Sequence, residues 1–364
     1  MNRQKRYMNK ALILVAFFIV LTVVTNGVIK YINSKSITPR SILNEMTVEQ
    51  KVGQLFMLGF WGQEPDYYIT KMISEREIGG VILFKYNIDN KDQVIKLTTK
   101  LQKMSAVPLF ISVDQEGGVV SRVEFEGTSS ISQADIKDET EAFTVAKRRA
   151  EELKELGINM NLSPVVDSIS DENAYLFNRA FRGERDEIVS LSKGMIKGYK
   201  EGGVLSTIKH FPGHSNASVD FHSALDSVDI PGEELDLYIY PFKEALGVSD
   251  AVIVGHILFP QIDAQYPASL SPYFINDLLR KKLGFNGLVI TDDMQMKSVY
   301  DRYSIAQAAV QAILAGNDIL IYSGSPQEQA DAYNAVVKAV NDGVISEKDL
   351  DSKVLRILTV KNSL

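Results

Sequence analysis

The side chains best suited to chemistry in this sequence are carboxylates, histidines and hydroxyls, because the chain has no cysteine. That absence excludes disulfides, cysteine-ligated zinc, iron–sulfur clusters and a thiol nucleophile. Three of the four histidines fall within KHFPGHSNASVDFH, residues 209–222. In this segment Asp220 and His222 are two residues apart, a spacing that can set a carboxylate beside an imidazole and raise the pKa of the histidine. The pair is therefore a candidate acid/base unit, although a solvated histidine with a chance neighbour is the plainer alternative.

The same segment raises the question of a metal, since His210 and His214 have the i, i+4 spacing of a helical zinc pair. Pro212 and Gly213 lie between them and would break a helix. No glutamate occupies the position that a metalloprotease needs. We therefore expect no metal and no cofactor, and we interpret the segment as a strand end that continues into a loop over a pocket.

Eight short apolar runs could position these side chains. They are QLFMLGF from Gln54, GGVILF from Gly79, PLFISVD from Pro108, INMNLSPV from Ile158, STIKHF from Ser206, AVIVGHI from Ala251, GLVITDD from Gly287 and DILIYSG from Asp318. Continuously apolar runs are typical of strands buried on both faces, and segments with helical periodicity separate most of them. No dinucleotide-binding or P-loop glycine motif follows a run. The pattern predicts an α/β fold, a single (β/α)8 TIM-type barrel, with two further helices after residue 326 and Ser346 as a cap.

Polar residues stand where most of the predicted strands end. They are Asp114, Asp167, Lys209, His210, His256, Asp292, Asp293 and Ser323. An aspartate after a strand often does no more than cap the next helix. In barrels of this type, however, chemistry gathers at the C-terminal ends of the strands. The convergence of these residues on one face therefore predicts a shared functional site.

Residues 1–30 have the pattern of an export signal or membrane anchor. Nineteen uncharged residues follow the basic stretch MNRQKRYMNK, and at about 1.5 Å per residue they could just cross a bilayer. The basic flank predicts that the chain after Lys30 lies outside the cytoplasm. We favour an uncleaved anchor because no clean A-x-A site follows. Residues 31–46 would be a polar stalk, and the catalytic barrel would occupy 47–364, starting with a capping box in TVEQ at Thr47.

The distribution of charge argues against nucleic acid as a partner. The formal net charge is −7, and a marked cluster of basic residues is found at the extreme N-terminus. The remaining chain is therefore more acidic than the total suggests and would repel phosphates. A membrane signal explains the basic cluster better than a nucleic-acid site does.

Nine short motifs follow one another along the chain in a characteristic order. They are MTVEQKVGQLFMLGF (46–60), IGGVILF (78–84), DQEGGVVSR (114–122), NLSPVVD (161–167), NRAF (178–181), KHFPGH (209–214), D-x-H (220–222), GHI (255–257) and GLVITDDM (287–294). Together they resemble glycoside hydrolase family 3, specifically its single-domain bacterial β-N-acetylglucosaminidase, or β-hexosaminidase, branch. The fold of that family is the barrel already expected from the apolar runs.

The resemblance implies a retaining exo-β-N-acetylglucosaminidase that cleaves terminal β-linked N-acetylglucosamine from peptidoglycan fragments or related glycans. Asp292 would attack the anomeric carbon to form a covalent glycosyl-enzyme, with Asp293 as a neighbour. His222, oriented by Asp220, would be the general acid/base in place of a second carboxylate. The positions implied to grip the sugar hydroxyls are Asp114, Arg122, Arg179, Lys209 and His210. For the two arginines, ion pairing within the protein is the alternative.

The loop after His214 departs from the family pattern K-H-F-P-G-H-G-D-T followed by D-S-H. Here Ser215, Asn216 and Ala217 replace the glycine-containing sequence, and Phe221 stands between the predicted acid/base pair. A stiffer loop with an added apolar face is expected. Two other functions stay open: a phosphorylase that uses the same residues, since histidine repels phosphate less than a carboxylate does, and an anchored glycan-binding protein without activity.

Overall fold

The computed structural model describes residues 38–126, 130–216 and 225–364, and it divides the chain into two compact units, 1–45 and 46–364. In the first unit, helix α2 (Pro39–Glu45) lies within the segment predicted to be a stalk. In the part of the chain that the structure describes, no helix is long and apolar enough to cross a membrane. The predicted anchor falls in residues 1–30, outside the described residues, and stays a prediction.

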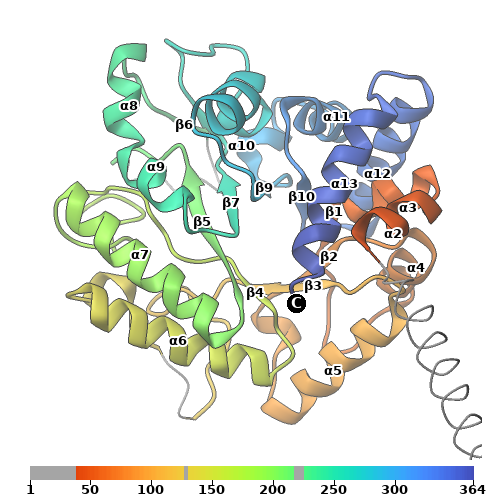
Figure 1. Cartoon of the computed structure of the whole chain (residues 1–364), viewed down its shortest axis with the longest axis horizontal. Coiled ribbons are helices and arrows are strands. Elements are labelled where there is room, and N and C mark those ends of the chain that lie inside the picture. The colour runs from red at the N-terminus through yellow and green to blue at the C-terminus, as the bar shows by residue number, and fades with distance from the viewer. Residues whose placement is uncertain (1–37, 127–129, 217–224) are drawn as a thin grey trace, which may run out of the picture. The chain divides into compact units, whose positions relative to one another are not determined.

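The second unit is built on a closed barrel of eight parallel strands (Figure 1). In order around the barrel they are β1 (Phe56–Leu58), β2 (Gly80–Leu83), β3 (Phe110–Val113), β4 (Met160–Asn161), β5 (Leu205–Phe211), β7 (Ala251–Val254), β9 (Leu288–Asp293) and β10 (Ile319–Tyr322), and β10 closes the barrel onto β1. Every strand lies within one of the apolar runs, apart from Leu205, which begins β5 one residue before its run. The predicted (β/α)8 barrel is therefore confirmed.

Burial on both faces explains why these strands are continuously apolar. Side chains of β1, β2, β3 and β7 are almost entirely inaccessible to solvent. One face of each strand packs inside the barrel and the other against the surrounding helices, so neither face can carry solvated polar groups along its length. Polar side chains accumulate instead at the strand ends, where the packing stops.

Helices surround the barrel and connect its strands (Figure 1). They are α3 (Val48–Gln54), α4 (Tyr67–Arg76), α5 (Lys91–Met104), α6 (Glu139–Glu155), α7 (Arg185–Gly202), α8 (Leu235–Tyr238), α9 (Tyr240–Leu246), the π-helix η5 (Tyr273–Lys282), α10 (Lys297–Tyr300), α11 (Ile305–Ala315), α12 (Pro326–Asn341) and α13 (Glu347–Lys361). The predicted capping box is present, since Thr47 and Gln50 each bond the other's backbone N–H. Ser346 caps α13 as predicted, accepting from the N–H of Asp349.

A second, two-stranded parallel sheet was not predicted from the sequence. It pairs β6 (Asp226–Ser227) with β8 (Ile257–Leu258), which follows the barrel strand β7. Strands of two residues are too short to show any periodic signal in a sequence. The sheet fixes the chain directly after residues 217–224 beside the C-terminal end of β7.

Candidate active site

A pocket of about 440 Å³ opens at the C-terminal ends of the barrel strands. Six of the residues predicted to act on a ligand line it: Asp114, Arg122, Arg179, Lys209, His210 and Asp292. Asp293 and Ser323, at the ends of β9 and β10, line it as well. The other two predicted catalytic residues, Asp220 and His222, lie outside the described residues, so their placement and role stay predictions.

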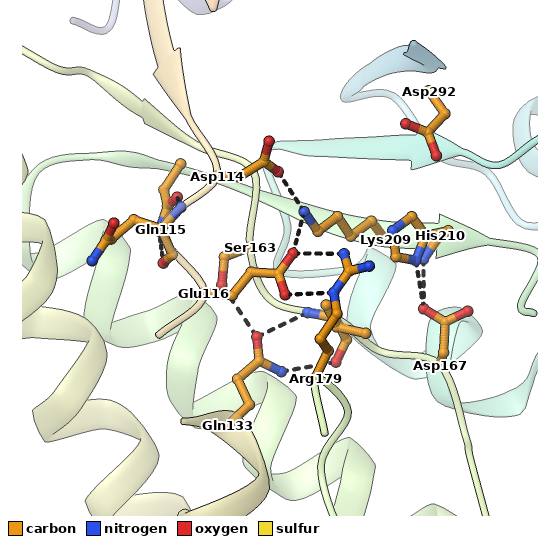
Figure 2. Close-up of polar contacts among 12 residues, drawn as sticks. Asp114, Gln115, Glu116, Gln133, Ser163, Asp167, Arg179, Lys209, His210 and Asp292 are labelled. Carbon is orange, nitrogen blue, oxygen red and sulfur yellow. Dashed lines mark hydrogen bonds and ion pairs between the residues drawn. The ribbon is translucent and has the colours of Figure 1, made fainter. Parts of the chain in front are cut away.

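A buried glutamate that the sequence reasoning missed organises the cations of this pocket (Figure 2). The Glu116 side chain is 1% exposed and accepts two hydrogen bonds from Arg179, from Nε at 2.9 Å and from Nη2 at 2.8 Å. Lys209 Nζ lies 2.6 Å from Glu116 Oε1 and 2.6 Å from Asp114 Oδ1. Four charged side chains thus form one network, which fixes the lysine and the arginine against the pocket wall.

The charges in this network stabilise one another. Burial raises the pKa of Glu116, but the Arg179 guanidinium and the Lys209 ammonium more than offset it and hold that pKa well below its usual range. Burial likewise lowers the pKa of Lys209, whereas Asp114 and Glu116 raise it above its ordinary value. Both groups are therefore ionised at neutral pH. Arg179 forms an ion pair with Glu116, which is the alternative stated for the arginines in the sequence analysis. It also lines the pocket.

Two adjacent carboxylates at the end of β9 have opposite pKa shifts. Burial raises the pKa of Asp292, but His210, His256, the N–H of Asp293 and Lys209 lower it to about 2. Burial lowers the pKa of both histidines, although the carboxylates beside them, Asp167 and Asp292, oppose that shift. Burial raises the pKa of Asp293 to about 6 even though its carboxylate accepts a hydrogen bond from the Ser323 hydroxyl. Asp292 is thus the carboxylate that stays ionised in mild acid.

Histidines at the strand ends are held by fixed partners. His210 Nδ1 lies 2.9 Å from Asp167 Oδ2, and the other oxygen of Asp167 accepts from the N–H of His214 at 2.7 Å. His214 Nδ1 lies 3.0 Å from Asp226 Oδ2. Asp167, predicted at the fourth strand end, therefore positions His210 and does not line the pocket. Within residues 38–126, 130–216 and 225–364, no three or more His, Asp or Glu side chains are arranged to bind a metal ion.

His256 supports the strand that carries the two aspartates. Its Nε2 lies 3.0 Å from the carbonyl oxygen of Asp293, and its Nδ1 lies 2.6 Å from the hydroxyl oxygen of Ser269. Since a carbonyl can only accept, Nε2 carries the proton and Nδ1 accepts from the serine. The neutral imidazole thereby anchors the backbone next to Asp292.

Comparison with known proteins identifies the family to which this chain belongs. The family model described as "Glycosyl hydrolase family 3 N terminal domain" matches residues 47–360. The chain belongs to glycosyl hydrolase family 3. The resemblance found in the sequence motifs is thereby confirmed at the level of the family.

Relatives in glycosyl hydrolase family 3 match most of the chain. It is 32% identical over 329 residues to "Beta-hexosaminidase A" of Pseudoalteromonas piscicida, covering 81% of this chain and 55% of that protein. It is 31% identical over 317 residues to a beta-hexosaminidase of Idiomarina loihiensis, covering 85% of this chain and 93% of that protein. The solved family 3 β-N-acetylglucosaminidase of Paenibacillus sp. str. FPU-7 superimposes with a TM-score of 0.84 at 38% identity, over 87% of this chain and 62% of that one. The chain thus spans just over half of the first relative and nearly all of the second.

Sequence reasoning missed Glu116 although it stands in the motif DQEGGVVSR of this family 3 chain. A glutamate in a loop is usually solvated, so its residue type gives no sign that it is buried. The available signal was its position two residues after Asp114, on the same strand end as a predicted ligand group. Lys209 was a second signal, because a lysine predicted at the end of a buried strand requires a buried acidic partner.

Replacing Glu116 by glutamine should lower the free energy of unfolding by about 3 kcal/mol, because Arg179 and Lys209 would stay buried without their shared charge. Urea denaturation at pH 7 measures the change. Glu116 has a lowered pKa in the folded chain. The stability that it contributes is therefore present above its ordinary pKa of 4.5 and is lost as the pH falls below it. The variant should lose less stability than the wild type over that acidic range.

Glu64 offers a matched control for this substitution. It pairs with Lys100 at 2.7 Å, but its side chain is 68% exposed. An exposed pair contributes little, so Glu64→Gln should change the free energy of unfolding by less than about 1 kcal/mol. Equal, small changes in the two variants would show that Glu116 does not organise the pocket.

Proposed function

We propose that this family 3 chain is a retaining exo-β-N-acetylglucosaminidase that acts outside the cell membrane on peptidoglycan fragments or related glycans. One observation carries the proposal: an ionised carboxylate, Asp292, shares an enclosed pocket with Asp114 and the cations Arg122 and Lys209. A pocket of this kind, with acceptors and charged donors on its walls, suits a hydroxyl-rich ring. A pocket, in contrast to an open groove, suits removal of a terminal sugar.

Arg122 supports the binding of a polar ligand at this site. Its guanidinium lies over the ring of Phe84, 5.9 Å from the centroid, and both residues line the pocket. In the described parts of the chain, no hydrogen-bond partner reaches the buried Nε of Arg122. A buried donor without a partner is costly. The other N–H groups of the guanidinium are the donors that a sugar hydroxyl in the pocket would meet.

The proposed reaction has two steps. An oxygen of Asp292 forms a bond to the anomeric carbon while the glycosidic bond breaks, and the leaving oxygen takes a proton from the general acid. Water then attacks the glycosyl-enzyme, and the same group, now a base, accepts its proton. Asp292 returns as a free carboxylate and the sugar leaves with its original configuration.

We assign the acid/base role to His222, oriented by Asp220. The described residues that flank this pair support the assignment. His214 lines the pocket and is hydrogen-bonded to Asp226, at 3.0 Å. His222 is four residues before Asp226 in the sequence. The residue assigned the acid/base role therefore stands in the sequence between His214, which lines the pocket, and its hydrogen-bond partner Asp226.

A panel of aryl β-glycosides tests the proposal, with the anomer of the product followed by NMR. We expect the N-acetylglucosaminide to be cleaved fastest, with the β-anomer formed first and a rate that phosphate leaves unchanged. Accumulation of a sugar 1-phosphate would show that the phosphorylase alternative is right. First release of the α-anomer would contradict the retaining mechanism. No cleavage of any glycoside, with binding of glycan retained, would favour the anchored binding protein.

A further inference from the structure

Three aromatic rings form a ladder that starts at the pocket wall and ends in solvent. Phe84 lines the pocket, and its ring is stacked with that of Tyr86 at a centroid distance of 5.4 Å and an interplanar angle of 15°. Tyr86 in turn is stacked with Trp61 at 4.2 Å and 19°. Trp61 is 63% exposed. We call Phe84, Tyr86 and Trp61 the aromatic ladder.

A buried asparagine holds the ladder in place. The Asn87 side chain is completely inaccessible to solvent. Its Nδ2 donates to the carbonyls of Phe60 at 2.9 Å and Gly62 at 2.6 Å, the two residues that flank Trp61. Its Oδ1 accepts from the N–H of Phe84 at 2.9 Å. One side chain thus ties both ends of the ladder together, so the exposed indole is presented by a fixed backbone.

The ladder belongs to the catalytic face of the barrel. Trp61 follows β1 and Phe84 follows β2, which are paired neighbours, so both rings lie beyond the C-terminal strand ends. Burial raises the pKa of Tyr86, Asp293 raises it further and Arg122 lowers it. The tyrosine hydroxyl is therefore within electrostatic reach of two pocket residues. The ladder thus begins in the pocket wall at Phe84, and Trp61 is two rings farther along the stack.

We propose that the aromatic ladder binds the sugar on the leaving-group side of the cleaved bond, with the face of its ring stacked on Trp61. This inference rests on the proposed function, because a pocket that takes a terminal sugar leaves the rest of the glycan to pass over the pocket rim. A pyranose ring in β-linkage presents a face of C–H groups that packs on an aromatic plane. Aromatic side chains give a large, rigid contact area at such positions. Packing within the protein does not account for Trp61, since most of its surface faces water.

Two substrates with the same terminal sugar separate the ladder from the pocket. The β-linked disaccharide of N-acetylglucosamine places a sugar on the ladder, whereas methyl β-N-acetylglucosaminide does not. Trp61→Ala should lower kcat/KM for the disaccharide by about tenfold and change that for the methyl glycoside by less than about twofold. Trp61→Phe should restore most of the loss. Tyr67→Ala, which removes an aromatic side chain that is 76% exposed and outside the ladder, is the matched control and should affect neither substrate.

A direct binding measurement is available because Trp61 is the only tryptophan in the chain. In Asp292→Asn, which cannot turn substrate over, the disaccharide should shift the tryptophan emission, and N-acetylglucosamine alone, confined to the pocket, should not. Emission that the disaccharide leaves unchanged overturns the inference, and so does an equal loss of kcat/KM on both glycosides in Trp61→Ala. If neither glycoside is cleaved by the wild type, the proposed function fails, and the emission still decides whether the ladder binds sugar.

Discussion

Asp292→Ala should reduce turnover of an aryl β-N-acetylglucosaminide by about 10⁴-fold to 10⁶-fold, because no covalent intermediate can form without the carboxylate. The structure gives this residue the properties of a nucleophile. His210, His256, the N–H of Asp293 and Lys209 together lower its pKa to about 2, so it is ionised throughout the range in which the enzyme would work. Stopped assays on purified protein measure the loss, with thermal unfolding to show that the variant is folded.

The neighbouring aspartate provides the control for this prediction. Asp293 carries a pKa of about 6 and its side chain is bonded to Ser323 and to the N–H of Gln295. Asparagine can make equivalent hydrogen bonds, so Asp293→Asn should lose no more than about tenfold in turnover. If Asp292→Ala keeps more than a few per cent of the activity, or if Asp293→Asn is the more damaging substitution, the assignment of the nucleophile is wrong.

His222→Ala should lower the rate of cleavage of natural disaccharides by about 10³-fold. On activated substrates it should change the kinetics in a different way. A sugar is a poor leaving group and needs a proton as the bond breaks. An acidic phenol needs little protonation, so the first step would stay fast and the second, which requires a base, would be slow. Rapid mixing with an aryl glycoside should therefore show a burst of phenol before a slow steady state.

Asp220 should contribute through His222 alone. Asp220→Ala should give a milder form of the same defect, because the imidazole remains but loses its orienting partner and part of its basicity. The double variant should be little worse than His222→Ala, since residues that act as a unit have non-additive effects. Losses that multiply, or equal losses on activated and natural substrates, would assign the acid/base role to another group on the barrel rim.

The barrel could be predicted because burial on both faces leaves a direct mark on the sequence. The strand from Gly80 to Leu83 is one of eight apolar runs in which almost every side chain is inaccessible. The strand ends could be predicted for the converse reason, since Asp114 and Asp292 are polar residues at points where apolar runs stop. The strand-end residues of the pocket thus followed from the pattern of burial, whereas Arg122 and Arg179 were implied only by the family resemblance.

The contacts behind the pocket wall could not be predicted, because residue type does not reveal partners across the fold. Glu116 reads as a loop glutamate, yet it neutralises cations that lie 63 and 93 positions later in the chain. Asn87 reads as a turn residue, yet it joins two strand ends. Their roles depend on loops from different strands meeting in space, and that information is distributed over the whole chain.

Trapping the glycosyl-enzyme tests the central claim most directly. A 5-fluoro derivative of an activated N-acetylglucosaminide keeps the acetamido group and slows both steps, and a good leaving group lets the first outpace the second. After incubation, the mass of the intact protein should rise by one glycosyl residue, and fragmentation of the digested peptide that contains ITDDM should place the label on Asp292. A label on Asp293, or an active protein whose mass does not change, would contradict the account.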